Sequence, residues 1–143
     1  IIQSMANRSI TTLRQHGLRI TAVREKVLEI FLEAGQTALS NADIEKHFER
    51  LDRITLYRTL RTFEEKGLIH QVVDSSNTPK FAYCSNQCAE HDHHDDHAHF
   101  HCVKCEKTVC LEDTTLPSVS IPSGFKVEEK HMVLSGTCDA CGE

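Results

Sequence analysis

Four cysteines toward the end of the chain stand in two pairs, Cys102-x-x-Cys105 and Cys138-x-x-Cys141. The Cys-x-x-Cys spacing lets one metal ion take both thiolates of a pair, and two pairs complete a tetrahedral shell of four sulfurs. Such a shell leaves no coordination position open for a substrate, which is typical of structural zinc. We therefore predict a structural zinc site formed by these four residues.

A histidine-rich segment, residues 91–101 with the sequence HDHHDDHAHFH, lies directly before the first pair. Alternate residues of a strand share a face, so His97, His99 and His101 would point the same way. Neighbouring imidazoles on one face can bind one metal ion, and we predict that His97 and His99 are ligands of a second site. The other histidines of the segment, with its aspartates, are expected to form a loop that binds metal loosely or not at all.

The charges are divided unevenly along the chain. Residues 1–73 hold 11 Lys or Arg against 9 Asp or Glu, a net +2, and residues 74–143 hold 5 against 12, a net −7; together these give the −5 of the whole chain. All seven cysteines lie in the second part. The first part can therefore approach nucleic-acid phosphates, whereas the second part is suited to binding cations.

The composition argues against several classes of protein. The odd number of cysteines does not suit a secreted disulfide scaffold, and the sequence has neither an apolar run of about 18 residues nor a charged-then-apolar leader. We predict a reducing, cytoplasmic setting. Catalytic zinc is usually accompanied by a nearby glutamate, as in His-Glu-x-x-His or in His-x-Glu with Pro-Cys-x-x-Cys, and neither pattern occurs. We therefore expect no enzyme.

Apolar residues recur at helical spacing in the first half and predict three helices, around Val27, around Ile44 and over residues 53–63. An earlier helix is expected from about Ser9 to His16, and no structure is assigned to the four residues ahead of Met5. Start and stop signals support this: Thr21 suits the start of one helix, Ser40 or Asn41 the start of the next, and Gly67 the end of the last.

Two short β-like runs follow the helices, at residues 68–73 and 80–84, joined by the turn-rich residues 74–79. Helices followed by a hairpin describe a winged helix. The second helix of a helix-turn-helix enters the major groove of DNA, and here it would be residues 53–63.

The two faces of this helix differ in character. We assign its inner face to Ile54, Leu56, Leu60 and Phe63, and its outer, DNA-binding face to Arg53, Thr55, Tyr57, Arg58 and Arg61. Arginine can pair with guanine edges or phosphates, and the carbons of tyrosine and threonine can contact a thymine methyl. An ordinary solvated amphipathic helix would show the same charged outer face, so the helix alone does not decide between the two.

Several motifs occur in a fixed order: HGLRITAVR at residues 16–24, ITLYRTL at 54–60 with EEKGLI at 64–69, and the His-x-His segment followed by both Cys-x-x-Cys pairs. In this order they resemble the ferric uptake regulator family of bacterial metal-dependent repressors. The resemblance implies an α+β fold, with an N-terminal winged helix-turn-helix domain over residues 1–84, a hinge at its end, and a small C-terminal α/β dimerisation domain over 85–143 stapled by zinc. It also implies a homodimer that binds a double-stranded, AT-rich and palindromic DNA operator when a sensory metal is present.

The resemblance assigns roles to individual residues as well. Tyr57 and Arg58 match the family's recognition-helix pair, and Arg19 matches the basic residue ahead of the second helix. The sensory ligand positions correspond to Cys84, His97, His99 and Cys110, and His70 matches a ligand position of zinc-sensing members.

The sensed metal is inferred from the donor atoms. Iron and peroxide sensors usually have carboxylates where this chain has Cys84 and Cys110, and their histidine ahead of the third helix is replaced here near Ala38. Thiolates favour zinc over ferrous iron, so the chain is most similar to the zinc uptake regulator branch and is expected to be a zinc-sensing repressor. Three alternatives stay open: the two cysteines can instead pack as small hydrophobic residues, the sensed signal can be ferrous iron or peroxide, and the protein can be a zinc buffer or chaperone.

Some positions fit the resemblance poorly. A third exchangeable metal site would use Asp96 and His131, but Ala98 stands where the matching aspartate is expected, and Cys88 suits a spare thiol as well as a ligand. Residues 113–124 contain two prolines and are too short for the long dimerisation helix of many relatives. We expect a reduced α/β core.

Overall fold

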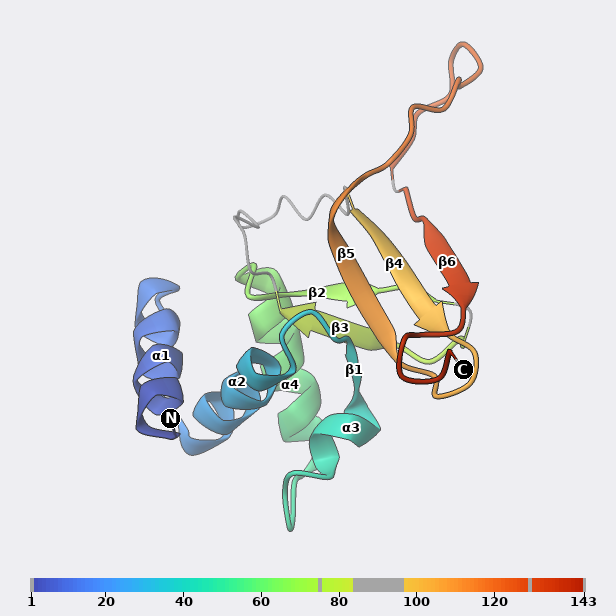
Figure 1. The fold of residues 1–143 in the computed structure, drawn as a ribbon. Helices are drawn as coiled ribbons and strands as arrows, with labels where there is room; N and C mark the ends of the chain where they lie inside the picture. Colours follow the sequence, from blue (N-terminus) through green and yellow to red (C-terminus); the bar gives the residue numbers. More distant parts are fainter. Residues whose placement is uncertain (1, 75, 84–96, 129, 143) are drawn as a thin grey trace.

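The computed structural model describes residues 2–74, 76–83, 97–128 and 130–142; for residues 2–6, 97, 112, 113 and 115 only the backbone is described. All of the described helices lie in the first half of the chain, and two small sheets follow (Figure 1). This arrangement confirms the α+β class. The predicted boundary between residues 84 and 85 lies outside the described residues and stays a prediction.

The helices begin and end where their capping residues direct. They are α1 (Ile2–Gln15), α2 (Ala22–Ala34), α3 (Asn41–Glu45) and α4 (Arg53–Glu65). At the start of α2 the Thr21 side chain accepts a hydrogen bond from the backbone N–H of Arg24, and Ser40 and Asp43 form a capping box at the start of α3. Gly67 follows the end of α4 with a φ of 77°, in the left-handed region that favours glycine. The predicted start and stop residues are confirmed.

The first helix is longer than predicted. It begins at Ile2, whereas the sequence predicted a start near Ser9 and assigned no structure to the residues ahead of Met5. These residues include no glycine or proline, and a helix anchored by the buried Leu13 can continue through them. Apolar periodicity marks only the part of α1 that packs, which is why the sequence indicated a start near Ser9.

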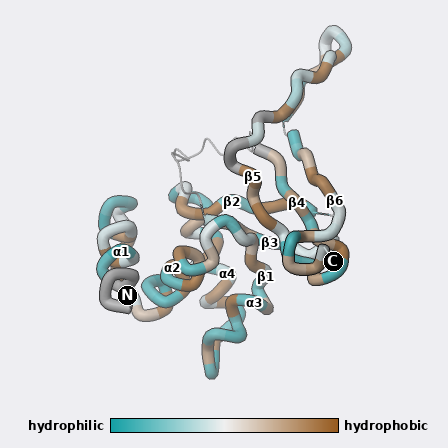
Figure 2. Tube along the Cα trace, viewed as in Figure 1, coloured by the Kyte–Doolittle hydropathy of each residue, from teal (hydrophilic) through white to brown (hydrophobic). Residues whose placement is uncertain are grey.

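The core of the first half is formed by the apolar faces of α2 and α4, and Figure 2 shows hydrophobic and hydrophilic residues alternating along these helices. Its largest fully buried side chains are Phe31 and Phe63. In α4, Leu56 and Leu60 face this core as predicted, whereas Ile54 is 60% exposed, which corrects its assignment to the inner face. Ile54 precedes Leu56 by two residues, about 200° around the helix, so the two side chains cannot share a face.

The first sheet is the predicted wing. It contains β1 (Leu39–Ser40), β2 (Ile69–Val72) and β3 (Lys80–Tyr83) in the order β1-β3-β2, with β2 and β3 antiparallel. The second sheet contains β4 (His97–Cys102), β5 (Thr108–Thr115) and β6 (Val133–Gly136) in the order β5-β4-β6. Here β4 pairs antiparallel with β5 and parallel with β6. The described residues after position 96 form strands and loops, without a helix.

Backbone hydrogen bonds join the two halves of the chain directly. The N–H of Ala38 donates to the carbonyl of Thr108 at 2.8 Å, and the N–H of Cys110 donates to the carbonyl of Gln36 at 2.9 Å. The loop between α2 and β1 therefore lies along β5 (Figure 1). The chain connecting β5 and β6 projects away from both sheets. In the described part of the chain, the length and apolarity of every helix fall short of what crossing a membrane requires.

Candidate metal centres and nucleic-acid surface

The four cysteines of the two Cys-x-x-Cys pairs converge at one end of the second sheet. Cys102 ends β4, and Cys138 and Cys141 follow β6. Because β6 runs parallel to β4, with Cys102 opposite Gly136, both strands deliver their cysteines to the same end. The four sulfur atoms lie within 4.8 Å of one another.

The spacing of these sulfurs fits one metal ion. Cys105 Sγ and Cys138 Sγ are 3.8 Å apart. A tetrahedral zinc with Zn–S bonds of about 2.3 Å separates its sulfurs by about 3.8 Å. We refer to Cys102, Cys105, Cys138 and Cys141 as the four-cysteine cluster, and its geometry can hold zinc.

The thiol pKa values in this cluster are spread apart. Backbone N–H groups of Cys105 and Cys138 hydrogen-bond to the sulfur of Cys102 and lower its pKa to about 6. The hydrogen bond between the Cys141 and Cys138 side chains, together with burial, raises the pKa of Cys141 to about 12. One thiolate is thus stabilised while a neighbouring thiol keeps its proton. A divalent cation would replace these protons, because it attracts all four thiolates at once.

A second cluster lies between the two sheets and consists of His70, His99 and Cys110. Their ligand atoms lie within 4.8 Å of one another, and all three residues are buried. Cys110 Sγ and His70 Nε2 are 3.6 Å apart, which is a hydrogen-bonding distance for sulfur. It is also the separation of about 3.6 Å expected for a sulfur and a nitrogen on one tetrahedral zinc. We call these residues the interdomain cluster.

Strand pairing explains how the interdomain cluster forms. His99 and Cys110 are direct partners across the antiparallel β4–β5 pair, so their side chains share a face. His70 comes from β2 in the other sheet, where it pairs with Ala82. Cys110, on β5 of the second sheet, packs against Val72 and Ala82 of the first sheet. The cluster therefore takes ligands from both halves of the chain.

Cys110 also packs in an apolar environment. It is 1% exposed and packs with Ala38, Val72 and Ala82, as a small hydrophobic residue would. Its sulfur nevertheless faces the ring nitrogen of His70. Ala38, at the position where the resemblance indicated a missing histidine, belongs to this same apolar group.

Several predicted ligands are not placed. Cys84, Cys88 and residues 91–96 lie outside the described residues, and His97 belongs to β4 without a described side chain. His131 is exposed. His101, expected on the same face as His99, has its Nδ1 2.9 Å from Thr108 Oγ1 and takes part in a separate buried polar group.

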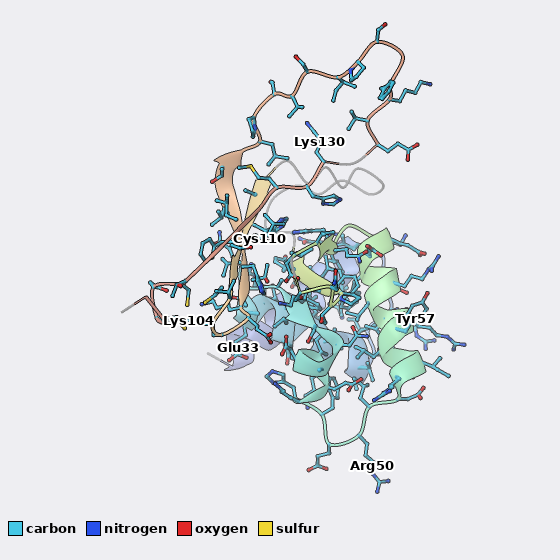
Figure 3. All side chains as sticks on the ribbon, turned by 90° about the vertical axis from the view of Figure 1, so that its right-hand side faces the viewer. Glu33, Arg50, Tyr57, Lys104, Cys110 and Lys130 are labelled. Atoms are coloured by element: carbon cyan, nitrogen blue, oxygen red, sulfur yellow. The ribbon has the colours of Figure 1, made fainter. Side chains whose placement is uncertain are left out.

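The outer face of α4 presents most of the predicted DNA-binding residues to solvent. Tyr57 is 57% exposed, and it points away from the body in Figure 3. Arg58 is also exposed, as is Arg19 ahead of α2. The guanidinium group of Arg61 donates to the Tyr57 hydroxyl at 3.0 Å. This contact holds an aromatic ring and a cation side by side on the surface.

Two residues of this surface have additional roles. The Thr55 hydroxyl donates to Asp52 Oδ2 at 3.0 Å, so it takes part in the cap of α4. Ile54, which the sequence analysis missed as a surface residue, adds an exposed apolar side chain next to it. Such a side chain can contact a thymine methyl.

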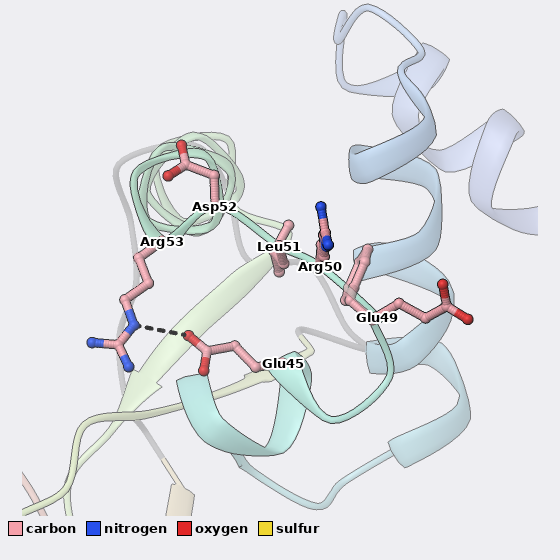
Figure 4. Close-up of a pocket in the computed structure, with 7 residues that line it drawn as sticks. Glu45, Glu49, Arg50, Leu51, Asp52 and Arg53 are labelled. Carbon is pink, nitrogen blue, oxygen red and sulfur yellow. Dashed lines mark ion pairs between the residues drawn. The ribbon is translucent and has the colours of Figure 1, made fainter.

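A pocket lies beside the first turn of α4 (Figure 4), lined by Glu45, Phe48, Glu49, Arg50, Leu51, Asp52 and Arg53. Arg53 Nε is 3.9 Å from Glu45 Oε1 across this pocket, and the Arg53 side chain is 89% exposed. Ion pairs between exposed side chains contribute little to stability and are screened by salt. A DNA phosphate can therefore replace Glu45 as the partner of Arg53.

Comparison with known proteins agrees with this architecture. The family model described as the ferric uptake regulator family matches residues 15–135. The chain is 27% identical over 144 residues to the peroxide operon regulator of Bacillus subtilis, covering 94% of this chain and 92% of that protein. It is 29% identical over 139 residues to the ferric uptake regulation protein of Synechococcus elongatus, covering 90% and 89%.

The fold is likewise similar to a solved structure. A zinc uptake regulator in complex with zinc and DNA superposes with a TM-score of 0.64 at 22% identity, covering 97% of this chain and 93% of that chain. The family model spans most of the sequence and includes α2, α4, the first sheet, β4, β5 and the first Cys-x-x-Cys pair. The protein belongs to the ferric uptake regulator family.

Proposed function

We propose that this protein is a zinc-responsive transcriptional repressor, which binds operator DNA in the cytoplasm as a homodimer when zinc occupies the interdomain cluster. The convergence of His70, His99 and Cys110 from two sheets carries this proposal. The four-cysteine cluster would hold a second, permanent zinc.

The donor atoms of the interdomain cluster support zinc as the sensed metal. Two imidazole nitrogens and one thiolate suit a tetrahedral ion without preference for oxygen ligands, whereas carboxylate oxygens would suit harder metals. A fourth donor would complete the shell, and Cys84 and His97 are our candidates from the sequence. The related peroxide and ferric uptake regulators leave iron or peroxide as the competing signal.

Zinc would act by fixing the orientation of the two halves. His70 moves with the wing, whereas His99 and Cys110 move with the second sheet, so one ion bound to all three joins them. A zinc site with four ligands contributes about 10 kcal/mol at neutral pH, and a hinge is biased by a few kcal/mol. Only the difference in zinc affinity between the two orientations shifts the equilibrium.

The bound orientation would place the DNA-binding helices of a dimer. Two helices of this kind read half-sites about 34–36 Å apart, one helical turn of DNA. A zinc uptake regulator of similar fold has been solved in complex with zinc and DNA, which supports zinc as the activating ion. Exposed Arg53, Tyr57 and Arg58 would make the contacts.

The experiment measures DNA binding against buffered free zinc, using a fragment selected from a random library by the zinc-loaded protein. His70→Ala should abolish the rise in DNA affinity with zinc, while His47→Ala, at an exposed histidine outside both clusters, serves as the matched histidine control and should keep it. Arg58→Ala should weaken binding at every zinc concentration, because it removes a DNA contact and leaves the switch intact.

Two results would contradict the proposal. A full zinc response in His70→Ala would remove the interdomain cluster as the sensor. A response of the unchanged protein to ferrous iron with none to zinc would favour an iron or peroxide sensor, and zinc binding without DNA binding would favour a zinc buffer.

A further inference from the structure

A buried polar group that includes no residue of either cluster joins the wing to the second sheet. It consists of Asp74 and Lys80, at the two ends of the turn between β2 and β3, together with His101 on β4 and Thr108 on β5. We call these four residues the latch. The alternation of strand residues predicted His101 on the same face as the metal ligands, and no role was predicted for the other three residues.

Thr108 is the centre of the latch. Its hydroxyl donates to Asp74 Oδ2 at 2.6 Å and accepts from Lys80 Nζ at 3.1 Å. The single hydroxyl hydrogen is then used, so the Nδ1 of His101, 2.9 Å away, must be the donor of that contact. One hydroxyl thus uses its donor and both acceptor positions, and it contacts one polar atom each of Asp74, Lys80 and His101.

An ion pair closes the latch from the wing side. Lys80 Nζ lies 2.9 Å from Asp74 Oδ2, with the lysine side chain 8% exposed and the aspartate side chain fully buried. Burial alone would raise the pKa of Asp74, but hydrogen bonds from Ser76, Thr108 and Lys80 outweigh it and hold that pKa well below its ordinary value. The aspartate is therefore held as a charged acceptor by these neighbours.

The latch lies one strand repeat away from the interdomain cluster. Thr108 is two residues before Cys110, and His101 is two residues after His99. On the wing, Lys80 is two residues before Ala82, the partner of His70. Residues two apart in a strand share a face, so latch and cluster contact the same interface between the halves. Lys80 also donates to the carbonyl of Glu106 at 2.9 Å, beside the first Cys-x-x-Cys pair.

We propose that the latch is a positioning device that holds the wing against the β4–β5 pair and so brings His70 to His99 and Cys110 before metal binds. This inference rests on the proposed function, because it treats the interdomain cluster as the sensory site. Latch and zinc then favour the same orientation, and each increases the effect of the other. A protein without the latch must use part of its zinc affinity to restore that orientation.

Thr108→Val tests this most directly, because it removes the hydroxyl with little change of shape. Zinc affinity of the interdomain cluster, measured by competition with a chelator while the four-cysteine cluster stays loaded, should fall by about tenfold. DNA affinity without the second zinc should fall by a similar factor, and at saturating zinc it should return to about the wild-type value. The zinc response therefore becomes larger in the variant, which a simple loss of stability would not produce.

Two further variants control the experiment. Thr108→Ser keeps the hydroxyl and should restore zinc affinity, and Thr114→Val makes the same substitution at an exposed position of β5 and should change nothing. Folding is checked by circular dichroism; if Thr108→Val does not fold, Asp74→Asn is measured in its place, with the same expected loss of zinc affinity.

The outcomes separate the two proposals. Unchanged zinc affinity in a folded latch variant, or an equal loss in Thr114→Val, would overturn the latch and leave the proposed function standing. Absence of any zinc effect on DNA binding by the unchanged protein would overturn the proposed function, and the latch as a device of that switch with it.

Discussion

The two cysteine-containing clusters differ in where their ligands come from. The four-cysteine cluster is built within the second sheet, from the ends of the parallel pair β4 and β6. The interdomain cluster takes one residue from the wing and two from the second sheet. A metal bound within one domain can only stabilise that domain, whereas a metal bound between two domains also fixes their orientation. This difference is the basis for separating a permanent site from a switch.

Their surroundings differ in the same sense. Cys105 is exposed, and Cys138 and Cys141 are half-buried, at an edge held mainly by short loops. All three residues of the interdomain cluster are buried and fixed by strand pairing on both sides. Three of the four cysteines of the first cluster lie in loops outside the strands, whereas the strands that carry the second cluster are joined to the rest of the chain by backbone hydrogen bonds and the latch.

The largest expected effect is therefore the loss of the four-cysteine cluster. Cys138→Ser should unfold the second sheet or separate the dimer, because a structural zinc supplies about 10 kcal/mol that this small sheet lacks other means to replace. Thermal unfolding and light scattering measure the change, with Cys110→Ser, which should stay folded, as the cysteine control. A stable dimer in Cys138→Ser would show that the cluster is not a structural zinc site.

A smaller effect is expected from the matching substitution in the interdomain cluster. Cys110→Ser should leave a folded protein with its first zinc, but zinc affinity at the second site should fall by about tenfold or more, because a hydroxyl is a poorer ligand for zinc than a thiolate. Elemental analysis before and after mild chelation measures the zinc content. We expect two zinc ions per chain before chelation and one after it, because the second site gives up its zinc first. Loss of both ions together would remove the distinction between the clusters.

The smallest expected effect concerns acid stability. The pKa of Asp74 is lower in the folded protein than the unfolded value of about 3.9, so the latch stabilises the fold above about pH 4 and loses that contribution as the pH falls further. Chemical unfolding from pH 6 to pH 3 should show a smaller decline in Asp74→Asn than in the unchanged protein. Identical declines in the free energy of unfolding would mean that this carboxylate does not contribute to stability at low pH.

The sequence predicted the parts of the fold that depend on local signals. Thr21, Ser40 and Gly67 mark helix ends by their own chemistry, and the two Cys-x-x-Cys pairs indicate one shared site by spacing alone. These inferences need only neighbouring residues.

Other features depend on contacts between distant segments. Nothing near Asp74 or Thr108 indicates that the two side chains meet, because their separation in sequence is closed only by the packing of the wing on the second sheet. His101 fits the alternation that predicted it as a ligand, yet a different partner lies opposite it. Ile54 was misassigned because its apolar side chain suggested burial, whereas its position around α4 decides its exposure.

The central claim is that zinc in the interdomain cluster controls DNA binding. The most direct measurement is DNA affinity at one and at two zinc ions per chain, by fluorescence anisotropy with the four-cysteine cluster loaded throughout. We predict that affinity rises by at least about tenfold as the second zinc binds, and that His70→Ala shows no rise. Equal DNA affinity at one and two zinc ions per chain would contradict the account.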